Sequence, residues 1–290
     1  MRVLRPETVR QALRALDEAG EDTTVIAGGT AVMLMMRNGL LFPEQLVSLD
    51  RLPGLDHIGV EDDVRIGALT PLRQVERSRE LARVLPTLTG ATALVANHRV
   101  RARATIGGNV CESDYASDPP SVLTALGCRL RVASNQGERW VPLEDFLLGY
   151  YETALQRGEL VTELRIRRPS PTARFIYLKY ISRSAEDRPC LGVAALVEAD
   201  ESGRCSEVQV AVGGATATPF RVPEVLAEAR GAKIDDPGTW EMLAEGYRGA
   251  IEPIGDARGS ADYRKHVTGE LVRRALTMVS GGAANGAIRL

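Results

Sequence analysis

Two glycine-containing stretches decide the fold predicted for this chain: Ala27-Gly28-Gly29-Thr30 and Thr105-Ile106-Gly107-Gly108-Asn109. Each one interrupts an apolar run at a point where the backbone could approach a ligand closely. Because glycine has no Cβ atom, paired glycines let consecutive N–H groups turn inward and surround an anion. We therefore predict that the amides of both bends bind one anionic group, such as a diphosphate, between them.

The first bend lies between a predicted strand and a predicted helix. Thr23-Thr24-Val25-Ile26 is rich in β-branched residues and predicts a short buried strand. Residues 31–37 predict a helix with Thr30 at its N-cap. Unpaired amides and the positive end of the helix dipole then point at one spot, an arrangement typical of phosphate-binding sites.

The composition is that of an ordinary globular protein, and it excludes several functions. The chain has 290 residues, enough for two domains, of which 44% are hydrophobic and 26% are charged. Aromatic residues make up only 4% and the formal charge is −2, so no nucleic-acid-binding surface is expected. No apolar run approaches the roughly 20 residues that a membrane helix needs, and the N-terminus lacks the apolar core of a signal peptide. We expect a cytoplasmic protein without a membrane span.

Cysteine spacing and nucleotide-binding motifs point away from other classes of site. Cys111, Cys128, Cys190 and Cys205 form no CxxC pair, so neither a zinc ribbon nor a four-cysteine iron–sulfur site is indicated. Free thiols fit a reducing compartment. The first bend lacks the GxGxxG of Rossmann folds, and the GxxxxGK(S/T) of P-loop hydrolases is missing.

The first 170 residues predict alternating strands, turns and helices. Helices are expected at 6–20, 71–75, 86–97 and from Asp118, a hairpin at 56–60 and 64–68, and further strands at 46–49, 130–133, 139–141 and 160–167. The stretch 98–109 carries Arg99, Arg101 and Arg103 at alternating positions, which predicts a strand leading into the second bend. These arginines would face solvent, a partner subunit or a diphosphate.

A second structural unit follows Pro169-Ser170-Pro171-Thr172, because two prolines interrupt both helices and sheets. After this linker we expect strands near 175–182, 190–198 and 205–213, and helices near 222–231, 238–247 and 260–279. Three strands followed by three helices predict a small α+β domain. Residues 281–290 predict a flexible tail, because the glycine- and alanine-rich stretch that begins it has little to bury.

The two bends, together with Asp118-Pro119-Pro120, resemble those of the FAD-binding medium subunit of the molybdenum hydroxylases. This family includes the medium subunit of aerobic carbon monoxide dehydrogenase and the FAD domain of xanthine dehydrogenase. The likeness covers nearly the whole chain, with smaller matches at 46–50, 66–70, 146–149, 153–155, 212–215 and 259–264. Each piece is common, but their order and spacing together are specific.

The resemblance implies an α+β fold with two parts. A two-lobed FAD-binding domain of the vanillyl-alcohol oxidase type would cover residues 1–170, with lobes at about 1–55 and 56–170. A small C-terminal α+β domain would cover 174–280.

The resemblance also implies which residues bind FAD. The expected cofactor-binding residues are Val25, Ile26, Ala27, Gly28, Gly29, Thr30, Ala31, Val32, Val95, Thr105, Ile106, Gly107, Gly108, Asn109, Asp118, Val161 and Lys179. Residues 25–32 would bind the diphosphate through backbone amides, and 105–109 would line the flavin and phosphate side. Asp118 would contact a sugar or ribityl hydroxyl, or else cap the helix that follows it. Lys179 would reach the flavin from the second domain, unless it points outward from its strand.

The chain departs from the family pattern at Ala31, where a polar residue is common after the Gly-Gly-Thr. This leaves the backbone contacts in place and removes one side-chain contact. Some relatives carry an inserted iron–sulfur cluster or a covalent histidine link to FAD. The dispersed cysteines indicate no cluster, and no sequence context marks His57, His98 or His266 as a link, so we expect noncovalent FAD.

The function that follows from the resemblance is electron transfer, with no catalytic acid, base or nucleophile. A large molybdenum-binding subunit would oxidise the substrate, and a small subunit with two 2Fe-2S clusters would relay electrons to FAD in this chain. FAD would pass them to an external acceptor, and the complex would be a dimer of heterotrimers. A stand-alone flavin oxidase or reductase with the same domain is the alternative. A scaffold that has lost its cofactor is a third possibility, disfavoured by the intact glycines.

Overall fold

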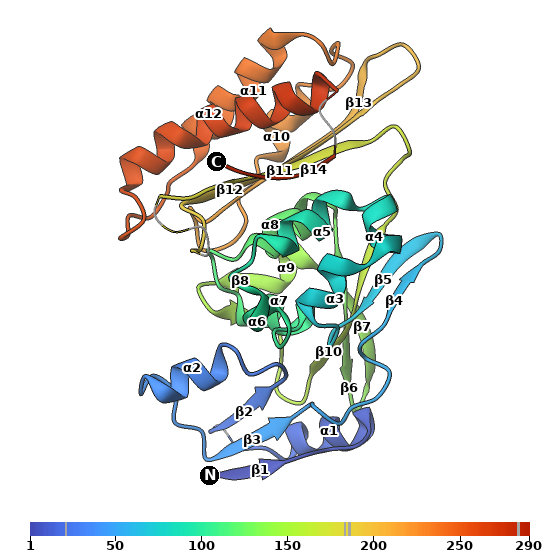
Figure 1. Ribbon diagram of the computed structural model, residues 1–290, viewed down its shortest axis with the longest axis vertical. Helices are drawn as coiled ribbons and strands as arrows, with labels where there is room; N and C mark the ends of the chain where they lie inside the picture. Colours follow the sequence, from blue (N-terminus) through green and yellow to red (C-terminus); the bar gives the residue numbers. More distant parts are fainter. Residues whose placement is uncertain (21, 183, 185–186, 283–284) are drawn as a thin grey trace.

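The computed structural model describes residues 1–20, 22–182, 184, 187–282 and 285–290. Its three main sheets follow one another along the long axis of the molecule (Figure 1). The first sheet contains residues 2–48, the second 58–167 and the third 174–289.

The first sheet is small and parallel, in the order β1-β3-β2, with β1 at Arg2–Leu4, β2 at Thr23–Ile26 and β3 at Gln45–Ser48. Helix α1 (Val9–Asp17) connects β1 to β2, and buries Ala12, Leu13 and Leu16 in the same core as Val47. Its N-cap is Thr8, whose hydroxyl accepts a hydrogen bond from the Gln11 amide. Helix α2 (Val32–Arg37) follows β2 and buries no residue.

The second sheet has the antiparallel order β4-β5-β10-β6-β7. Its strands are β4 (Ile58–Val60), β5 (Asp63–Gly67), β6 (Arg129–Ser134), β7 (Gly137–Pro142) and β10 (Leu160–Arg167). The helices are α3 (Leu72–Arg77), α4 (Arg79–Val84), α5 (Pro86–Ala93), α6 (His98–Arg101), α7 (Ile106–Glu112), α8 (Asp118–Ala125) and α9 (Leu143–Phe146). A two-stranded ribbon, β8 (Leu147–Gly149) with β9 (Glu152–Thr153), completes this part.

The third sheet is ordered β13-β12-β11-β14. It contains β11 (Arg174–Tyr180), β12 (Leu191–Ala199), β13 (Cys205–Gly213) and β14 (Gly286–Arg289). Helices α10 (Pro223–Ala227), α11 (Pro237–Ala250) and α12 (Ala261–Ser280) lie on one side of it, and α5 and α8 lie on the other (Figure 1). Both faces of the sheet are therefore covered.

The position of β11 between two layers decides where its side chains go. Ile176 and Leu178 belong to the core shared with α11 and α12, whereas Phe175 and Tyr177 belong to the core of the preceding domain. Successive side chains of a strand point to opposite faces. Lys179 therefore shares the face of Phe175 and Tyr177 and points at the first domain.

The prediction of a three-stranded sheet and a flexible tail is wrong for residues 286–289. These residues form β14, which pairs in parallel with β11. Ala287 packs tightly against α5, because a Cβ atom added at Gly90 would lie 3.1 Å from its Cβ. Pairing with a strand about a hundred residues earlier leaves no local signal in such a short segment.

The stretch 98–109 also differs from its prediction as a strand. The Asn97 side chain accepts hydrogen bonds from the amides of Arg99 and Val100, and this cap begins α6. The glycines of the second stretch then lie in the first turn of α7. No helix in the described part of the chain is long and apolar enough to cross a membrane.

Candidate functional site: a cavity lined by both glycine stretches

The two glycine stretches lie against each other. A Cβ atom added to Gly28 would lie 1.9 Å from the carbonyl oxygen of Arg103, so only glycine allows this approach. Gly29 has a φ of 75°, which also favours glycine. A Cβ atom added to Gly108 would lie 3.8 Å from the Cβ of Ala27. The turn after β2 thus packs against the segment that leads into α7.

The amides of residues 28–32 are left without partners inside the described part of the chain. The first hydrogen bond of α2 runs from the Met33 amide to the Gly29 carbonyl, and the amides of residues 28–32 donate none to the described residues. The prediction that Thr30 caps this helix is wrong, because Ala31 occupies the N-cap and has no side-chain acceptor. These donors are therefore available to an anionic ligand.

The amides of residues 106–109 all donate hydrogen bonds within the protein, contrary to the prediction for this bend. The Ile106 amide donates to Thr70 and the Gly107 amide to Ala68, at 3.0 and 2.9 Å. The Gly108 and Asn109 amides donate to the side chain and carbonyl of Thr105, which is the N-cap of α7. Residues 106–109 therefore form a close-packed wall, and the row of free amides is that of residues 28–32.

A cavity of about 660 Å³ lies where the two stretches meet. Its volume is within the range of small-molecule and cofactor sites, about 300–1,000 Å³. Most of the predicted residues line it, namely Val25, Ala27, Gly28, Gly29, Thr30, Ala31, Val32, Val95, Thr105, Gly107, Gly108, Asn109, Asp118, Val161 and Lys179. Ile26 and Ile106 do not line it. Ile106 is completely buried, and the Ile26 carbonyl accepts from Leu49 in the first sheet.

A buried polar network closes one side of the cavity. The Lys179 ammonium lies 2.8 Å from Asp118 Oδ2 and 2.8 Å from the Leu94 carbonyl oxygen, and the Tyr177 hydroxyl lies 2.7 Å from Asp118 Oδ1. The Lys179 side chain is fully buried and that of Asp118 is 4% exposed. Lys179 is therefore not an outward-facing lysine, and Asp118 is not the N-cap of α8, which is Ser117.

The network holds one donor ready for a ligand. An ammonium group has three donors, and the bonds of Lys179 to Leu94 and Asp118 leave one for the cavity that this residue lines. Burial raises the pKa of Asp118, and the positive charge of Lys179 opposes that rise. Burial also raises the pKa of Tyr177 well above its usual value, so its hydroxyl remains a donor.

The loop between α5 and α6 is held from two sides. Leu94 accepts from Lys179, while the Arg101 guanidinium donates to the carbonyls of Val95 and Ala96 at 2.7 and 3.1 Å. Ala96 has a φ of 42°, an uncommon conformation for a residue with a side chain. The arginines of the predicted strand do not line the cavity, and Arg101 pairs with Glu76 at 2.8 Å.

Charged residues that the sequence reasoning missed line another part of the cavity. They include Glu112, Asp114 and Arg188, and Arg188 pairs with Asp114 at 2.6 Å. Burial and the nearby Asp114 raise the pKa of Glu112 to about 7. A helix over 106–112 places residues 108, 111 and 112 on one side, so recognising that helix in the sequence would have identified Glu112 but not Asp114 or Arg188. His57, His98 and His266 are not among the lining residues.

Two family models match the chain in succession. Residues 1–169 match the FAD binding domain in molybdopterin dehydrogenase, and residues 176–279 match the CO dehydrogenase flavoprotein C-terminal domain.

Similar proteins cover nearly the whole chain. The 6-hydroxypseudooxynicotine dehydrogenase complex subunit alpha of Paenarthrobacter nicotinovorans is 32% identical over 93% of this chain and 91% of that protein. The carbon monoxide dehydrogenase medium chain of Afipia carboxidovorans is 31% identical over 97% of both. A solved chain of carbon monoxide dehydrogenase from Hydrogenophaga pseudoflava superposes with a TM-score of 0.92, at 29% identity and 97% coverage of both. With this fold and these matches, the chain belongs to the family of FAD-binding flavoprotein subunits of the molybdopterin dehydrogenases.

Proposed function

We propose that this chain is the FAD-carrying electron-transfer subunit of a molybdenum-containing hydroxylase or dehydrogenase complex. The observation that carries the proposal is the row of unpartnered amides at residues 28–32, on the wall of a cavity of cofactor size. A diphosphate needs several hydrogen-bond donors at a place where backbone can approach it, and this turn supplies them. The resemblance to named medium chains agrees with this assignment.

The residues present are suited to hold FAD without a covalent bond. The amides of residues 28–32 would bind the diphosphate, and Thr105, Gly107, Gly108 and Asn109 would form the wall beside it. Val95 and Val161 would pack along the cofactor, and Lys179 would donate its remaining N–H to it. Each oxygen of Asp118 already accepts one bond, but a carboxylate has about four acceptor sites, so a ligand hydroxyl could still bind. Bound FAD would supply the redox chemistry, and the protein would supply placement and electrostatics.

The proposed partners are a large subunit with the molybdenum cofactor and a small subunit with 2Fe-2S clusters, assembled as a dimer of heterotrimers. Relatives named as a medium chain or a complex subunit support a multi-subunit assembly. An external acceptor would take the electrons from FAD. The cytoplasm is the proposed location, in keeping with cysteines that are all free thiols.

Equilibrium dialysis of the purified chain against FAD tests cofactor binding. One FAD per folded chain is expected, released on denaturation without a covalent adduct. A chain that is folded by circular dichroism and binds no FAD would contradict the proposal and would favour the scaffold.

Tagged purification from the native host tests the subunit role. Molybdenum- and iron-containing chains are expected to elute with this one, and the FAD-loaded chain alone is expected to oxidise no substrate of the complex. Purification as an active single chain would instead favour the stand-alone oxidase or reductase.

A further inference from the structure

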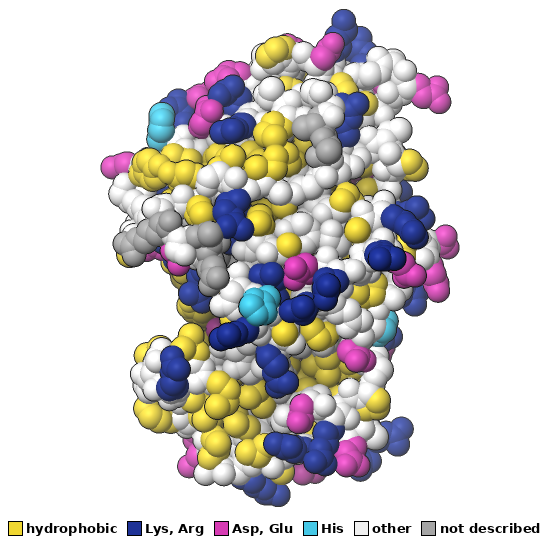
Figure 2. Space-filling model, in the orientation of Figure 1, with side chains coloured by type: hydrophobic (Ala, Val, Ile, Leu, Met, Phe, Trp, Pro, Cys, Tyr) yellow, Lys and Arg dark blue, Asp and Glu magenta, His cyan; other side chains and the backbone are white. Residues whose placement is uncertain are grey.

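A second pocket on the surface lies in a part of the chain that is rich in arginine. Residues 71–103 contain seven arginines and two glutamates, in a chain whose formal charge is −2. The arginines are Arg73, Arg77, Arg79, Arg83, Arg99, Arg101 and Arg103. Figure 2 shows Lys and Arg side chains gathered in the middle of the visible face, over the region of α3 and α6. This charge is local to the helical layer of the second sheet.

Within the described part of the chain, one of these arginines forms an ion pair. Arg101 pairs with Glu76, and this pair joins α6 to α3. Among the described residues, the other six guanidinium groups form no ion pair and no side-chain hydrogen bond. Unpaired cations on a rigid surface are suited to bind an anion.

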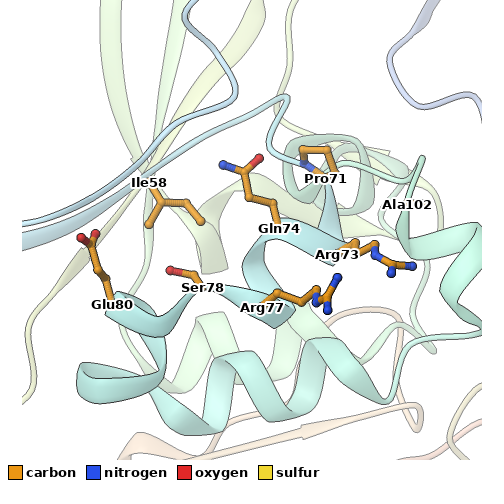
Figure 3. Close-up of a pocket in the computed structure, with 8 residues that line it drawn as sticks. All are labelled: Ile58, Pro71, Arg73, Gln74, Arg77, Ser78, Glu80 and Ala102. Carbon is orange, nitrogen blue, oxygen red and sulfur yellow. The ribbon is translucent and has the colours of Figure 1, made fainter.

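Two of the unpaired arginines, Arg73 and Arg77, line a pocket of about 570 Å³. They are four residues apart on α3, and Figure 3 shows both side chains extending to the same end of the pocket, away from Glu80. Like charges at this spacing repel each other. An anion between them would remove that repulsion.

The remaining lining is suited to an organic ligand. Ile58, Pro71 and Ala102 supply apolar surface, and Gln74 and Ser78 supply polar groups between Ile58 and the arginines (Figure 3). A guanidinium binds a phosphate through two parallel hydrogen bonds, which gives both strength and orientation. The volume is within the range of small-molecule sites.

We propose that this pocket binds a phosphorylated small molecule of the nucleotide class, with its phosphates on Arg73 and Arg77 and its ring on the apolar wall. This site is separate from the cofactor cavity, because none of its eight lining residues lines that cavity. The two hollows share one wall, however. Leu72, Val100 and Ala104 line the cofactor cavity, whereas Pro71, just before Leu72, and Ala102, between Val100 and Ala104, line the pocket.

Isothermal titration of the full chain with ADP tests the proposal. The chain is first saturated with FAD, so that ADP cannot occupy the cofactor cavity. Saturable binding of one ADP per chain is expected, with pyrophosphate binding more weakly and adenosine showing no saturation. Arg73→Gln/Arg77→Gln is expected to weaken ADP binding by about tenfold or more, through loss of charge-assisted hydrogen bonds.

The matched control is Arg79→Gln/Arg83→Gln on the neighbouring helix α4. It removes the same charge, but neither residue lines the pocket. This control is expected to change ADP affinity by no more than about twofold, because neither guanidinium lies in the pocket to hydrogen-bond the phosphates, and salt weakens interactions between exposed charges. The absence of saturable ADP binding, or equal losses in the two double variants, would overturn the proposal. Failure to take up FAD would count against the proposed function instead.

Discussion

Lys179 is the residue on which the chemistry of the cavity most depends. Its ammonium group is fully buried, paired with Asp118 and in contact with a carbonyl of the other domain. Removing one partner of a buried ion pair typically costs about 3–5 kcal/mol of stability. A useful variant must therefore remove both charges together.

Lys179→Met/Asp118→Asn is expected to fold and to bind FAD about tenfold to a hundredfold more weakly, because a charged hydrogen-bond donor is lost. The two removed charges are opposite and cancel in the net charge of the site, so the flavin midpoint potential is expected to fall only through loss of the Lys179 ammonium at the cofactor, which favours the reduced, more negative form. Fluorescence titration and spectroelectrochemistry measure the two effects. Lys233→Met, at an exposed lysine, serves as the control, and an unchanged affinity and potential in the double variant would remove Lys179 from the site.

Tyr177 anchors the same network from β11. Tyr177→Phe removes the hydroxyl that donates to Asp118 and is expected to lower the free energy of unfolding by about 1–3 kcal/mol. Tyr150→Phe is the control, because Tyr150 is 45% exposed, and a change within about 0.5 kcal/mol is expected there. Urea unfolding at neutral pH measures both variants. Equal losses of unfolding free energy would mean that the hydrogen bond from the Tyr177 hydroxyl does not stabilise the fold.

Glu112 makes stability depend on pH. Burial and Asp114 raise its pKa in the folded chain to about 7, from 4.5, so the folded state holds the proton more tightly than the unfolded state. The contribution of Glu112 to stability is thus largest below pH 4.5 and falls as the pH rises from 4.5 to about 7. Because the side chain is partly exposed, we expect the loss to be about 1 kcal/mol.

Glu112→Gln is therefore expected to be more stable than the unaltered chain at pH 8 and equally stable near pH 4.5. Urea unfolding at several pH values between these limits measures the difference. A difference that does not change with pH would show that Glu112 does not titrate in this range.

Among the structural elements, FAD binding depends most on the turn between β2 and α2. Gly28→Ala would place a Cβ atom 1.9 Å from a backbone carbonyl oxygen, so the turn must move away from residues 103–104. We expect a loss of at least about 2 kcal/mol in unfolding free energy and a loss of FAD binding. Gly59→Ala is the matched control, because nothing lies within 4 Å of the added atom. Equal behaviour of the two variants would contradict the close packing of the two stretches.

The elements with strong local patterns were predictable from the sequence. The strand at 23–26, with its β-branched residues, and the strand at 160–167 have the predicted bounds. The stretch 98–109 was predicted wrongly, because arginines at alternating positions imitate a strand while Asn97 and Thr105 cap two short helices. Most of the residues that the family resemblance implied do line the cavity, but so do many others that it did not imply. The first stretch offers free amides, whereas the second uses its amides in packing. This difference depends on hydrogen bonds to Ala68 and Thr70, which are distant in the sequence and leave no local pattern.

At the scale of the whole molecule, the cavity needs both domains. The turn after β2 supplies free amides, the helices of the second sheet supply the wall, and β11 supplies Lys179 from the third sheet. A second tie between the domains is the hydrogen bond from Tyr115 to Asp256, at 2.7 Å. Burial tends to raise the pKa of Asp256, but hydrogen bonds from Tyr115, Arg258 and Arg264 outweigh it and hold that pKa well below its usual value.

The most direct test of the account is a crystal structure of the full chain with FAD bound. We expect the diphosphate oxygens to lie within hydrogen-bond distance of amides in residues 28–32, with the Lys179 ammonium in contact with the cofactor. A diphosphate held elsewhere, with those amides facing solvent or protein, would contradict it.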